Sequence, residues 1–511
     1  MDSAAWTYRA STSSTSENPG EGHGSTWCDI SPVSSSPSTR TKAMSSITCW
    51  RGRGRWVGGP SARVTCSSSS RGCSTAPSSP DPRARCSSRS TTTSRCSSSR
   101  TTSTEGVTAG AALRDVKVVD LTQIVSGAVT TMLLADFGAD VVKIEPPDGE
   151  PYRSAGHAIQ TERGLTNLNI MRFSRGKRSV TLNLKSQGGR DVFEQLLADA
   201  DVLVENFRAG VLARLGYDAE RLRALNPRLV YTTVSGFGHT DLYPSAGTDP
   251  PTYAITAEAL GGLMHLCGGG GDDPPQWMGF AMTDIFAGTL AFAGTLMALR
   301  ERDRTGRGRR VDIAMLDAAA MMNDLSMAMY SVLGEVAGPG QYSLQAPWGP
   351  YRTVDGFVAI AVLSPAQWTA LCDLVGHPDL ATDPRLTTGR DRAKHHDELV
   401  RPAIEDWTAR QPKAAASDRL LARGIPSAPV NTAADVMNLQ RLAERDMFIE
   451  VEEPVVGRKR LVGNPIKVEG LANRGESVRI PRLGEHTEEV LSEELGYSRE
   501  LISQLRDVGA L

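Results

Sequence analysis

Short runs rich in valine and isoleucine alternate with helix-like segments in this chain, and the alternation limits the possible folds more than any other feature. Residues 116–121 and 140–145 are predicted to be buried strands, because each is a short β-branched run bounded by turn residues. The apolar segment between them has the length of one helix, and Gly138 stands where that helix would end. Further strands are predicted at 179–184, 201–205 and 228–234, with helices near 189–198 and 210–225. This order predicts an α/β fold whose large domain is a doubly wound, Rossmann-like parallel sheet.

The pattern changes near Gly349 and indicates a second, smaller α/β domain. Residues 351–362 read as a hairpin around Asp355-Gly356, and helices are predicted at 367–375, 391–408 and 412–422. A helix near Asp435, strands near 448–453 and 459–461, and a charged helix at 487–495 follow. We therefore predict a tail over 1–110, the first part of the large domain over 111–335, the small domain over 345–430, and a return to the large domain over 435–511.

The first 104 residues differ in composition from the rest. They contain 29 Ser and 15 Thr but no Leu and no Phe, and their 13 basic and five acidic residues give a net charge of +8. Such a stretch cannot bury enough apolar surface to offset the entropy of the chain, so we predict that the tail is disordered. Six of the eight cysteines lie there without a C-x-x-C pair, which argues against a metal or disulfide framework.

The tail also resembles GC-rich DNA translated in the wrong frame, because Ser, Arg, Thr, Pro and Cys are enriched and there is one Lys. We hypothesise that the natural protein starts near residues 107–113. Abundant peptides from residues 1–100 in mass spectrometry of the natural protein would contradict this hypothesis. The Arg-Gly run at 51–55 is short and isolated, and we predict no nucleic-acid partner.

The remaining 407 residues have the composition of a protein of the cytoplasm. They carry a net charge of −10, and their two cysteines, Cys267 and Cys372, lie far apart in sequence, as suits a reducing compartment. The longest uncharged run near the middle, 285–299, is shorter than the roughly 20 residues of a membrane span. We interpret it as a buried helix and predict no membrane contact.

The first strand–helix–strand unit could in principle bind a nucleotide, because helix N-termini at strand ends favour phosphate. Glu145 stands where a ribose-binding acid would stand. However, Gly127 is the only glycine between Leu121 and the predicted helix, so the G-x-G-x-x-G fingerprint is missing. Binding of NAD is therefore not favoured.

Asp284 is the most unusual acid of the chain, because it stands alone among the apolar and small residues 278–288. At the start of the uncharged helix it could cap the free backbone N–H groups. It could equally be a carboxylate nucleophile that forms a mixed anhydride with an acyl group in a dry pocket. Small residues recur along one face of the same helix and allow either close helix packing or close ligand approach: Ala287, Gly288, Ala291 and Gly294.

Five blocks of sequence carry a family resemblance. They are LLADFGADVVKIE at 133–145, RGKRSV at 175–180, VENFR at 204–208, LNPRLV at 225–230 and TGRGRRVD at 305–312. In this order they resemble the family III CoA-transferases (the CaiB/BaiF group), and the resemblance covers residues 113–470. The family's catalytic aspartate lies a short helix before the last block, where this chain has Asp284.

The resemblance implies a mechanism and a set of partners. Asp284 would attack an acyl-CoA donor and form first an aspartyl–acyl anhydride and then an aspartyl–CoA thioester, from which a carboxylic acid acceptor takes the CoA. CoA is then a substrate and no permanently bound cofactor is implied. Exchange between thioesters is near thermoneutral, so neither ATP nor a metal is required. The family also implies an interlocked homodimer.

Binding residues are implied by position in the family's motifs. The resemblance places CoA contacts at Val125, Ser126, Asn206, Phe207 and Arg214, with Lys177 as a further phosphate contact. Weaker matches for the substrate pocket are Tyr253, Gly338, Gly340 and Gln341.

Departures from the family pattern bear on the reaction. The related α-methylacyl-CoA racemase pairs its aspartate with an upstream histidine, and residues 247–255 contain none. Ala254 replaces the glutamate that follows Tyr253 in formyl-CoA transferase, and Ala128 stands where the family usually has proline. His239 and His265 lie outside the racemase position and are expected to be structural. An acyl-CoA racemase or isomerase and a catalytically silent CoA-binding protein remain as alternatives.

Overall fold

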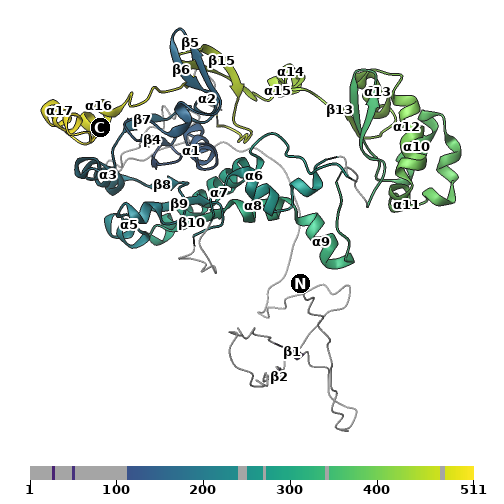
Figure 1. Cartoon of the computed structure of the whole chain (residues 1–511), viewed down its shortest axis with the longest axis horizontal. Helices are drawn as coiled ribbons and strands as arrows, with labels where there is room; N and C mark the ends of the chain where they lie inside the picture. Colours follow the sequence, from purple (N-terminus) through teal and green to yellow (C-terminus); the bar gives the residue numbers. More distant parts are fainter. Residues whose placement is uncertain are drawn as a thin grey trace, which may run out of the picture. The chain divides into compact units, whose positions relative to one another are not determined.

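The structure, a computed structural model, describes residues 26–28, 49–51, 112–239, 250–268, 272–339, 344–471 and 478–511 (Figure 1). The chain divides into two compact units, Met1–Arg100 and Thr101–Leu511. In the first unit β1 (Thr26–Cys28) pairs antiparallel with β2 (Cys49–Arg51). Most of the predicted tail, and with it the expectation of disorder, lies outside the described residues.

The second unit is built on a six-stranded sheet whose neighbouring strands are all parallel. The strands run in the order β10-β9-β8-β3-β4-β7. The chain therefore moves outwards from β3 to β7, returns to the other side of β3 at β8, and moves outwards again. This order confirms the predicted doubly wound, Rossmann-like fold. The bounds are β3 (Lys117–Asp120), β4 (Asp140–Glu145), β7 (Arg178–Thr181), β8 (Val202–Glu205), β9 (Val230–Ser235) and β10 (Arg310–Ala314).

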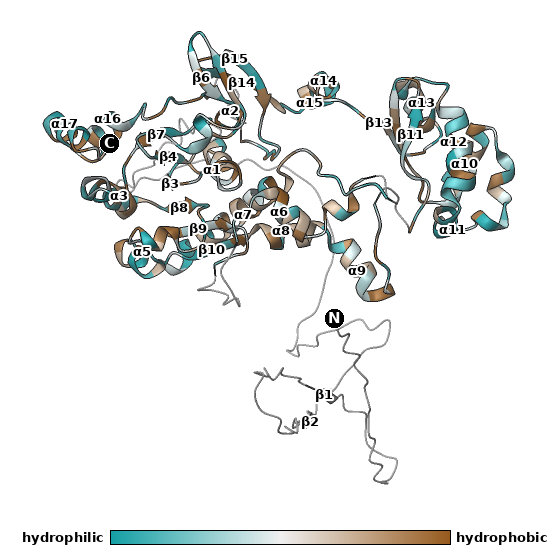
Figure 2. Cartoon of the chain, in the orientation of Figure 1, coloured by the Kyte–Doolittle hydropathy of each residue, from teal (hydrophilic) through white to brown (hydrophobic). Residues whose placement is uncertain are grey.

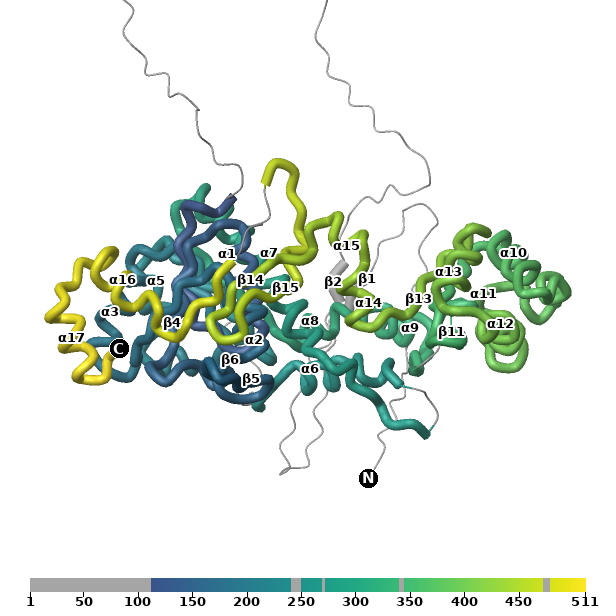
Figure 3. The backbone as a smooth tube through the Cα atoms, turned by 90° about the horizontal axis from the view of Figure 1, so that it is seen from above, coloured from purple at the N-terminus to yellow at the C-terminus, as the bar shows by residue number. Residues whose placement is uncertain are grey.

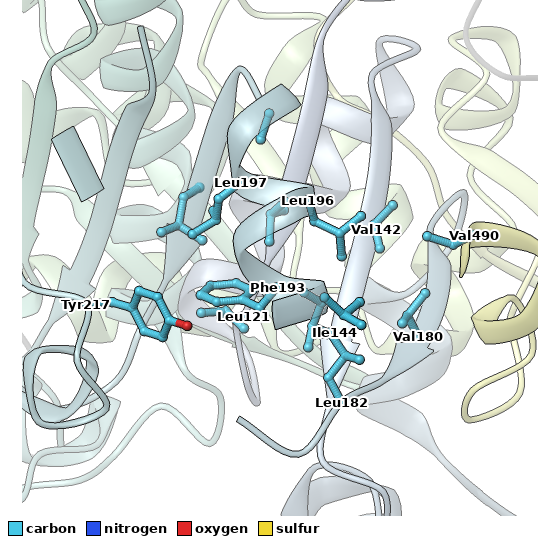
Figure 4. Close-up of a cluster of buried hydrophobic side chains, with 14 of the residues drawn as sticks. Leu121, Val142, Ile144, Val180, Leu182, Phe193, Leu196, Leu197, Tyr217 and Val490 are labelled. Atoms are coloured by element: carbon cyan, nitrogen blue, oxygen red, sulfur yellow. The ribbon is translucent and has the colours of Figure 1, made fainter. Parts of the chain in front are cut away.

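Helices cover both faces of the sheet because successive strand residues point to opposite sides. On one face Val119 and Leu203 pack against α3 (Gln187–Asp199) and α5 (Ala219–Leu225), as Figure 4 shows for Phe193 and Leu197 of α3. On the other face Val118 packs against α1 (Ser126–Asp136) and α7 (Met282–Thr305). In Figure 2 strand β8 and helix α8 (Met315–Met322) are largely brown, but only β8 is fully buried, whereas α8 is buried on one side.

Helix α7 is long and apolar enough to cross a membrane by length and composition alone. Here it packs in two core clusters against α1 and the sheet, as predicted for residues 285–299. Its small residues serve close packing. A Cβ added at Gly288 would lie 2.3 Å from the carbonyl oxygen of Ser126, and one at Gly294 would lie 2.7 Å from Cγ1 of Val311. The structure therefore shows the close helix packing at these two glycines.

A second sheet is formed by β11 (Trp348–Thr353), β12 (Gly356–Ala361) and β13 (Ser427–Pro429), which pair antiparallel. The predicted hairpin turn is found between β11 and β12. These strands share a separate hydrophobic core, drawn from residues 351–425, with α10 (Pro365–Val375), α12 (Arg401–Thr408) and α13 (Lys413–Leu421). On this ground we propose residues 345–430 as the small domain, and limited proteolysis near residues 335–345 tests that boundary.

Two predicted helices are interrupted. The helix expected at 210–225 is divided into α4 (Val211–Arg214) and α5, because Gly216 adopts a φ of 98° between them. The helix expected at 391–408 consists of α11 (Gly389–Lys394), a π-helical turn η5 (His396–Val400) and α12.

The last part of the chain returns to the first sheet. The strand β14 (Phe448–Glu453) matches its predicted bounds and pairs with β15 (Gly457–Val462) and β16 (Val478–Arg479). The backbone oxygen of Ala510 accepts a hydrogen bond from the N–H of Asn183, which places α17 (Arg499–Asp507) beside α3 (Figure 3). The other elements are η1 (Pro151–Arg153), β5 (Ala158–Thr161), β6 (Gly164–Asn167), α2 (Leu168–Phe173), α6 (Ala254–Leu260), η2 (Met264–Leu266), α9 (Asp324–Leu333), η3 (Pro378–Thr382), η4 (Pro384–Leu386), α14 (Ala433–Met437), α15 (Gln440–Glu444), α16 (Thr487–Glu489) and η6 (Val490–Glu494).

Candidate active site

A cavity of about 410 Å³ opens at the carboxyl ends of β3, β8 and β9. This is the point where the strand order reverses, between β3 and β8, and ligands of doubly wound sheets bind there. The walls come from the loops that leave the three strands, from the segment before α6 and from the start of α7. The residues that line it are Gln123–Ser126, Asn206–Ala209, Val211, Val234–Phe237, Pro250–Tyr253, Asp284 and Met315.

Asp284 lies in the first turn of α7 and faces this cavity. The helix begins at Met282 and Ala281 occupies the N-cap position, so the interpretation of Asp284 as the N-cap is wrong. Among the described residues no hydrogen-bond donor to its carboxylate is recorded. Burial, and secondly the charge of Glu258, raise the pKa of Asp284 to about 7. A carboxylate that is poorly solvated and more basic than usual is suited to act as a nucleophile.

Two tyrosines lie near Asp284. Tyr253, for which a place in the substrate pocket is predicted, is the N-cap residue of α6 and lines the cavity. Tyr152 comes from η1, far away in sequence. Partial burial raises the pKa of Tyr152, and the nearby Tyr253 and the charge of Asp284 add to this shift. The phenol of Tyr152 is thus near enough to Tyr253 and Asp284 to be influenced by both, although only Tyr253 and Asp284 line the cavity.

The loop after β3 has a strained backbone that neighbouring side chains hold in place. Ile124 has a φ of 65°, which is unfavourable for a β-branched residue. Its N–H donates to Oε2 of Glu150 at 3.1 Å. The side chain of Asn206 joins this loop to the loop after β8: its Oδ1 accepts from the N–H of Gln123 at 2.7 Å, and its Nδ2 donates to the oxygen of Gln123 at 2.7 Å and to Oγ of Ser126 at 3.1 Å. The loop is therefore shaped before any ligand binds.

The structure brings four predicted CoA-contact residues together with Asp284. Val125, Ser126, Asn206 and Phe207 all line the same cavity. The turn that carries Phe207 is held by its own backbone N–H, which donates to Oε2 of Glu205 at 2.7 Å.

Lys177 is not at the cavity, so the prediction that it contacts a phosphate is wrong. Its side chain is 1% exposed, and Nζ lies 2.9 Å from Oδ2 of Asp120 and donates to Oγ1 of Thr131 at 2.7 Å. Glu145 is likewise engaged: both of its oxygens accept from Arg153, at 2.6 and 2.7 Å. It is a structural acid and not a ribose ligand.

The other predicted residues lie apart from the cavity or outside the described chain. Arg214 is exposed on α4 and does not line the cavity, whereas Arg208, in the loop between β8 and α4, does. Gly338 is described but is not a lining residue, and Gly340 and Gln341 lie outside the described residues. No histidine occurs among the described residues that line the cavity.

Sequence reasoning did not identify Tyr152 and Glu258, because each reaches Asp284 through the tertiary fold. Arg208 was within reach of the sequence, since it follows Phe207 directly in the VENFR block.

The strand order and the cavity at its switch point define a Rossmann-type α/β protein with a nucleotide-sized site. The chain belongs to CoA-transferase family III, whose family model matches residues 113–487.

Named relatives and a solved structure agree with this assignment. The chain is 35% identical over 387 residues to the succinyl-CoA:mesaconate CoA-transferase of Haloarcula hispanica, and this alignment covers 75% of this chain and 96% of the relative. It is 33% identical to the formyl-CoA:oxalate CoA-transferase of Streptomyces coelicolor, with 78% and 99% covered. The crystal structure of a CaiB/BaiF family protein from Brucella suis matches with a TM-score of 0.65 at 30% identity, over 75% of this chain and 99% of that one.

Proposed function

We propose that this CoA-transferase moves CoA from an acyl-CoA to a carboxylic acid, with Asp284 as the nucleophile. The observation that carries the proposal is the position of Asp284: its carboxylate, with its pKa raised to about 7, shares one cavity with the loops at 123–126 and 206–209. A basic carboxylate held beside a CoA site can attack the thioester of the donor.

The reaction is balanced without a metal or ATP. The Asp284 oxygen attacks the acyl carbon, the C–S bond breaks, and CoA leaves as a thiolate from an aspartyl–acyl anhydride. The thiolate then attacks the aspartyl carbonyl, which gives an aspartyl–CoA thioester and releases the donor acid with one oxygen from Asp284. The acceptor carboxylate attacks this thioester, and the returning thiolate attacks the acyl carbon of the second anhydride. The acceptor leaves as its CoA thioester and Asp284 is a carboxylate again.

The described residues support the binding of CoA in this cavity. Helix α1 begins at Ser126, which lines the cavity, and no side chain caps its first turn, so its free N–H groups are suited to bind an anion. Arg208 supplies a cation that suits the CoA phosphates. The apolar lining by Phe207, Val234 and Met315 limits the access of water, which would hydrolyse the anhydride.

An exchange assay tests the function. The protein is incubated with succinyl-, acetyl- or formyl-CoA and a panel of free acids, without ATP and with a chelator, and new CoA thioesters are separated by chromatography. Because several relatives are named for mesaconate, oxalate or L-malate, we propose a short dicarboxylate as the acceptor. The rate should fall as the pH decreases through about 7, since protonated Asp284 is not a nucleophile. Absence of exchange across the panel, or solvent deuterium at the α-carbon of the acyl-CoA instead, would contradict the proposal.

We also propose a homodimer as the working form. The helix α9 and the segment after it expose large apolar side chains, and a soluble monomer rarely exposes such a patch. The partner that the family resemblance implies for this patch is a second copy of the chain. The residues are Leu325, Met327, Tyr330, Val332, Leu333 and Val336. Sedimentation equilibrium at micromolar protein should give twice the mass of the chain, and the mass of one chain would overturn the proposal.

We further propose a cytoplasmic location, because Cys267 and Cys372 are free thiols, and cell fractionation tests this location.

A further inference from the structure

Glu258 is a buried acid on α6 that contacts the first turn of α7. It is 2% exposed. Its Oε1 accepts hydrogen bonds from the backbone N–H and the hydroxyl of Thr283, at 3.1 and 3.2 Å, and its Oε2 accepts from Nε1 of Trp277 at 2.7 Å. Among the described residues no ion pair to Glu258 is found. These three bonds tie α6 both to the start of α7 and to the loop before it, and Thr283 is the residue that immediately precedes Asp284.

The charge of Glu258 acts on Asp284. Burial contributes most to the raised pKa of Asp284, and the negative charge of Glu258 contributes next. Two carboxylates close together in a medium of low dielectric constant repel each other, which destabilises the ionised nucleophile. When Asp284 becomes an anhydride or a thioester it carries no charge, so the repulsion ends. The arrangement therefore favours the acylated enzyme relative to the free carboxylate.

We propose that Glu258 is a positioning residue for CoA transfer: it fixes the first turn of α7 through Thr283, and its charge drives Asp284 towards the acylated state. The inference rests on the proposed function of Asp284 as the nucleophile.

Other titratable groups on the elements packed around the start of α7 do not replace this charge. Tyr152 of η1 and Tyr253 of α6 are phenols. Helix α1 has no charged residue before Asp136, and α8 has Asp317, which is exposed. On β9 there is no charged residue. Strand β10 carries Arg310 and Asp312. Oδ1 of Asp312 accepts a hydrogen bond from Oγ1 of Thr233 at 2.8 Å.

The pH dependence of the first half-reaction tests the proposal. Release of the donor acid in one turnover is followed by rapid quench over a pH series, with whichever of succinyl-, acetyl- and formyl-CoA reacts fastest. Glu258→Gln keeps the side-chain length and an acceptor for Thr283 but removes the charge. We expect the midpoint of its acid limb to shift down by about one pH unit. We expect its rate at alkaline pH to fall about threefold, as for other nucleophiles that become one unit less basic.

Two further variants keep the test decisive. Asp317→Asn removes one exposed charge on a helix that packs against α7 and should leave the midpoint unchanged. Glu258→Asp draws the charge back towards α6 and should shift the midpoint in the same direction by a smaller amount, which serves if the Gln variant does not fold. The proposal would be overturned if Glu258→Gln kept the wild-type midpoint and the wild-type rate at alkaline pH. It would also be overturned if Glu258→Asp kept the wild-type midpoint. If Asp284→Asn is inactive but the replacement of Glu258 changes neither the midpoint nor the rate, only this inference fails. If Asp284→Asn still transfers CoA, the proposed function fails as well.

Discussion

Replacing Asp284 with asparagine should lower kcat for CoA transfer by about 10⁴-fold or more while the protein stays folded. An amide has the size of the carboxylate but cannot form the anhydride with the donor acyl group. Burial raises the pKa of Asp284 in the folded protein to about 7, above the ordinary aspartate value of 3.8, so ionisation of Asp284 disfavours the fold once the pH exceeds the pKa of the unfolded carboxyl. The asparagine variant should therefore unfold at the same temperature or a higher one at pH 8, as a thermal scan would show.

The combination of lost activity and retained or increased stability distinguishes a nucleophile from a structural residue. Asp284→Ala serves as a second variant, because alanine cannot revert to the acid by deamidation. Asp317→Asn, on the exposed side of α8, is the control for loss of one negative charge and should transfer CoA at the wild-type rate. An asparagine variant that transfers CoA normally would show that another group is acylated.

Lys177→Met should destabilise the protein by about 3–5 kcal/mol, because it leaves the buried Asp120 without its ion-pair partner. Asp120 is 0% exposed and lies 2.9 Å from Nζ of Lys177. Burial opposes the ionised form of Asp120, but the charges of Lys177 and Lys143 and a hydrogen bond from Thr122 outweigh it and keep its pKa below the usual value. Urea unfolding measures the loss. The KM for the acyl-CoA should stay near the wild-type value, because Lys177 does not line the cavity.

Two further variants test whether the lost stability comes from the unpaired charge of Asp120. The double variant Lys177→Met with Asp120→Asn removes both charges and should recover part of the lost stability. Lys117→Met breaks the exposed ion pair with Asp199 and should cost less than about 1 kcal/mol. If Lys177→Met instead keeps the wild-type stability and raises the KM for acyl-CoA, Lys177 contacts CoA as its sequence motif suggested.

The sequence predicted the main sheet well where a strand is buried on both faces. The strand at 140–145, which is buried along nearly its whole length, has the predicted bounds because its β-branched run ends at Pro146. The strand at 448–453 also has the predicted bounds, although it lies in a separate sheet and is buried on one face only, because its apolar and acidic residues alternate. No strand is predicted at 310–314, because its arginine and its aspartate interrupt the apolar pattern and most of its residues are only partly buried. The hairpin of β5 and β6 has few apolar residues and was not predicted.

The candidate site was predictable as far as its signals are local. Asp284, Asn206 and Phe207 lie in short motifs, so a single sequence suffices to select them. Glu258 acts through Thr283 and Trp277, which lie 25 and 19 residues away, and no local pattern announces such contacts. Lys177 shows the opposite error: its motif marks a cation, but whether that cation faces a phosphate or a buried aspartate is decided by the packing of β3 and α1.

The most direct test of the central proposal is to trap the acyl-enzyme and locate it. The unmodified protein is incubated with an acyl-CoA, treated with hydroxylamine, digested and mapped by peptide mass spectrometry. The mechanism predicts a hydroxamate at Asp284 that forms only when an acyl-CoA is present. An unmodified Asp284 in protein that is actively transferring CoA, or a hydroxamate at a different carboxylate, would contradict it.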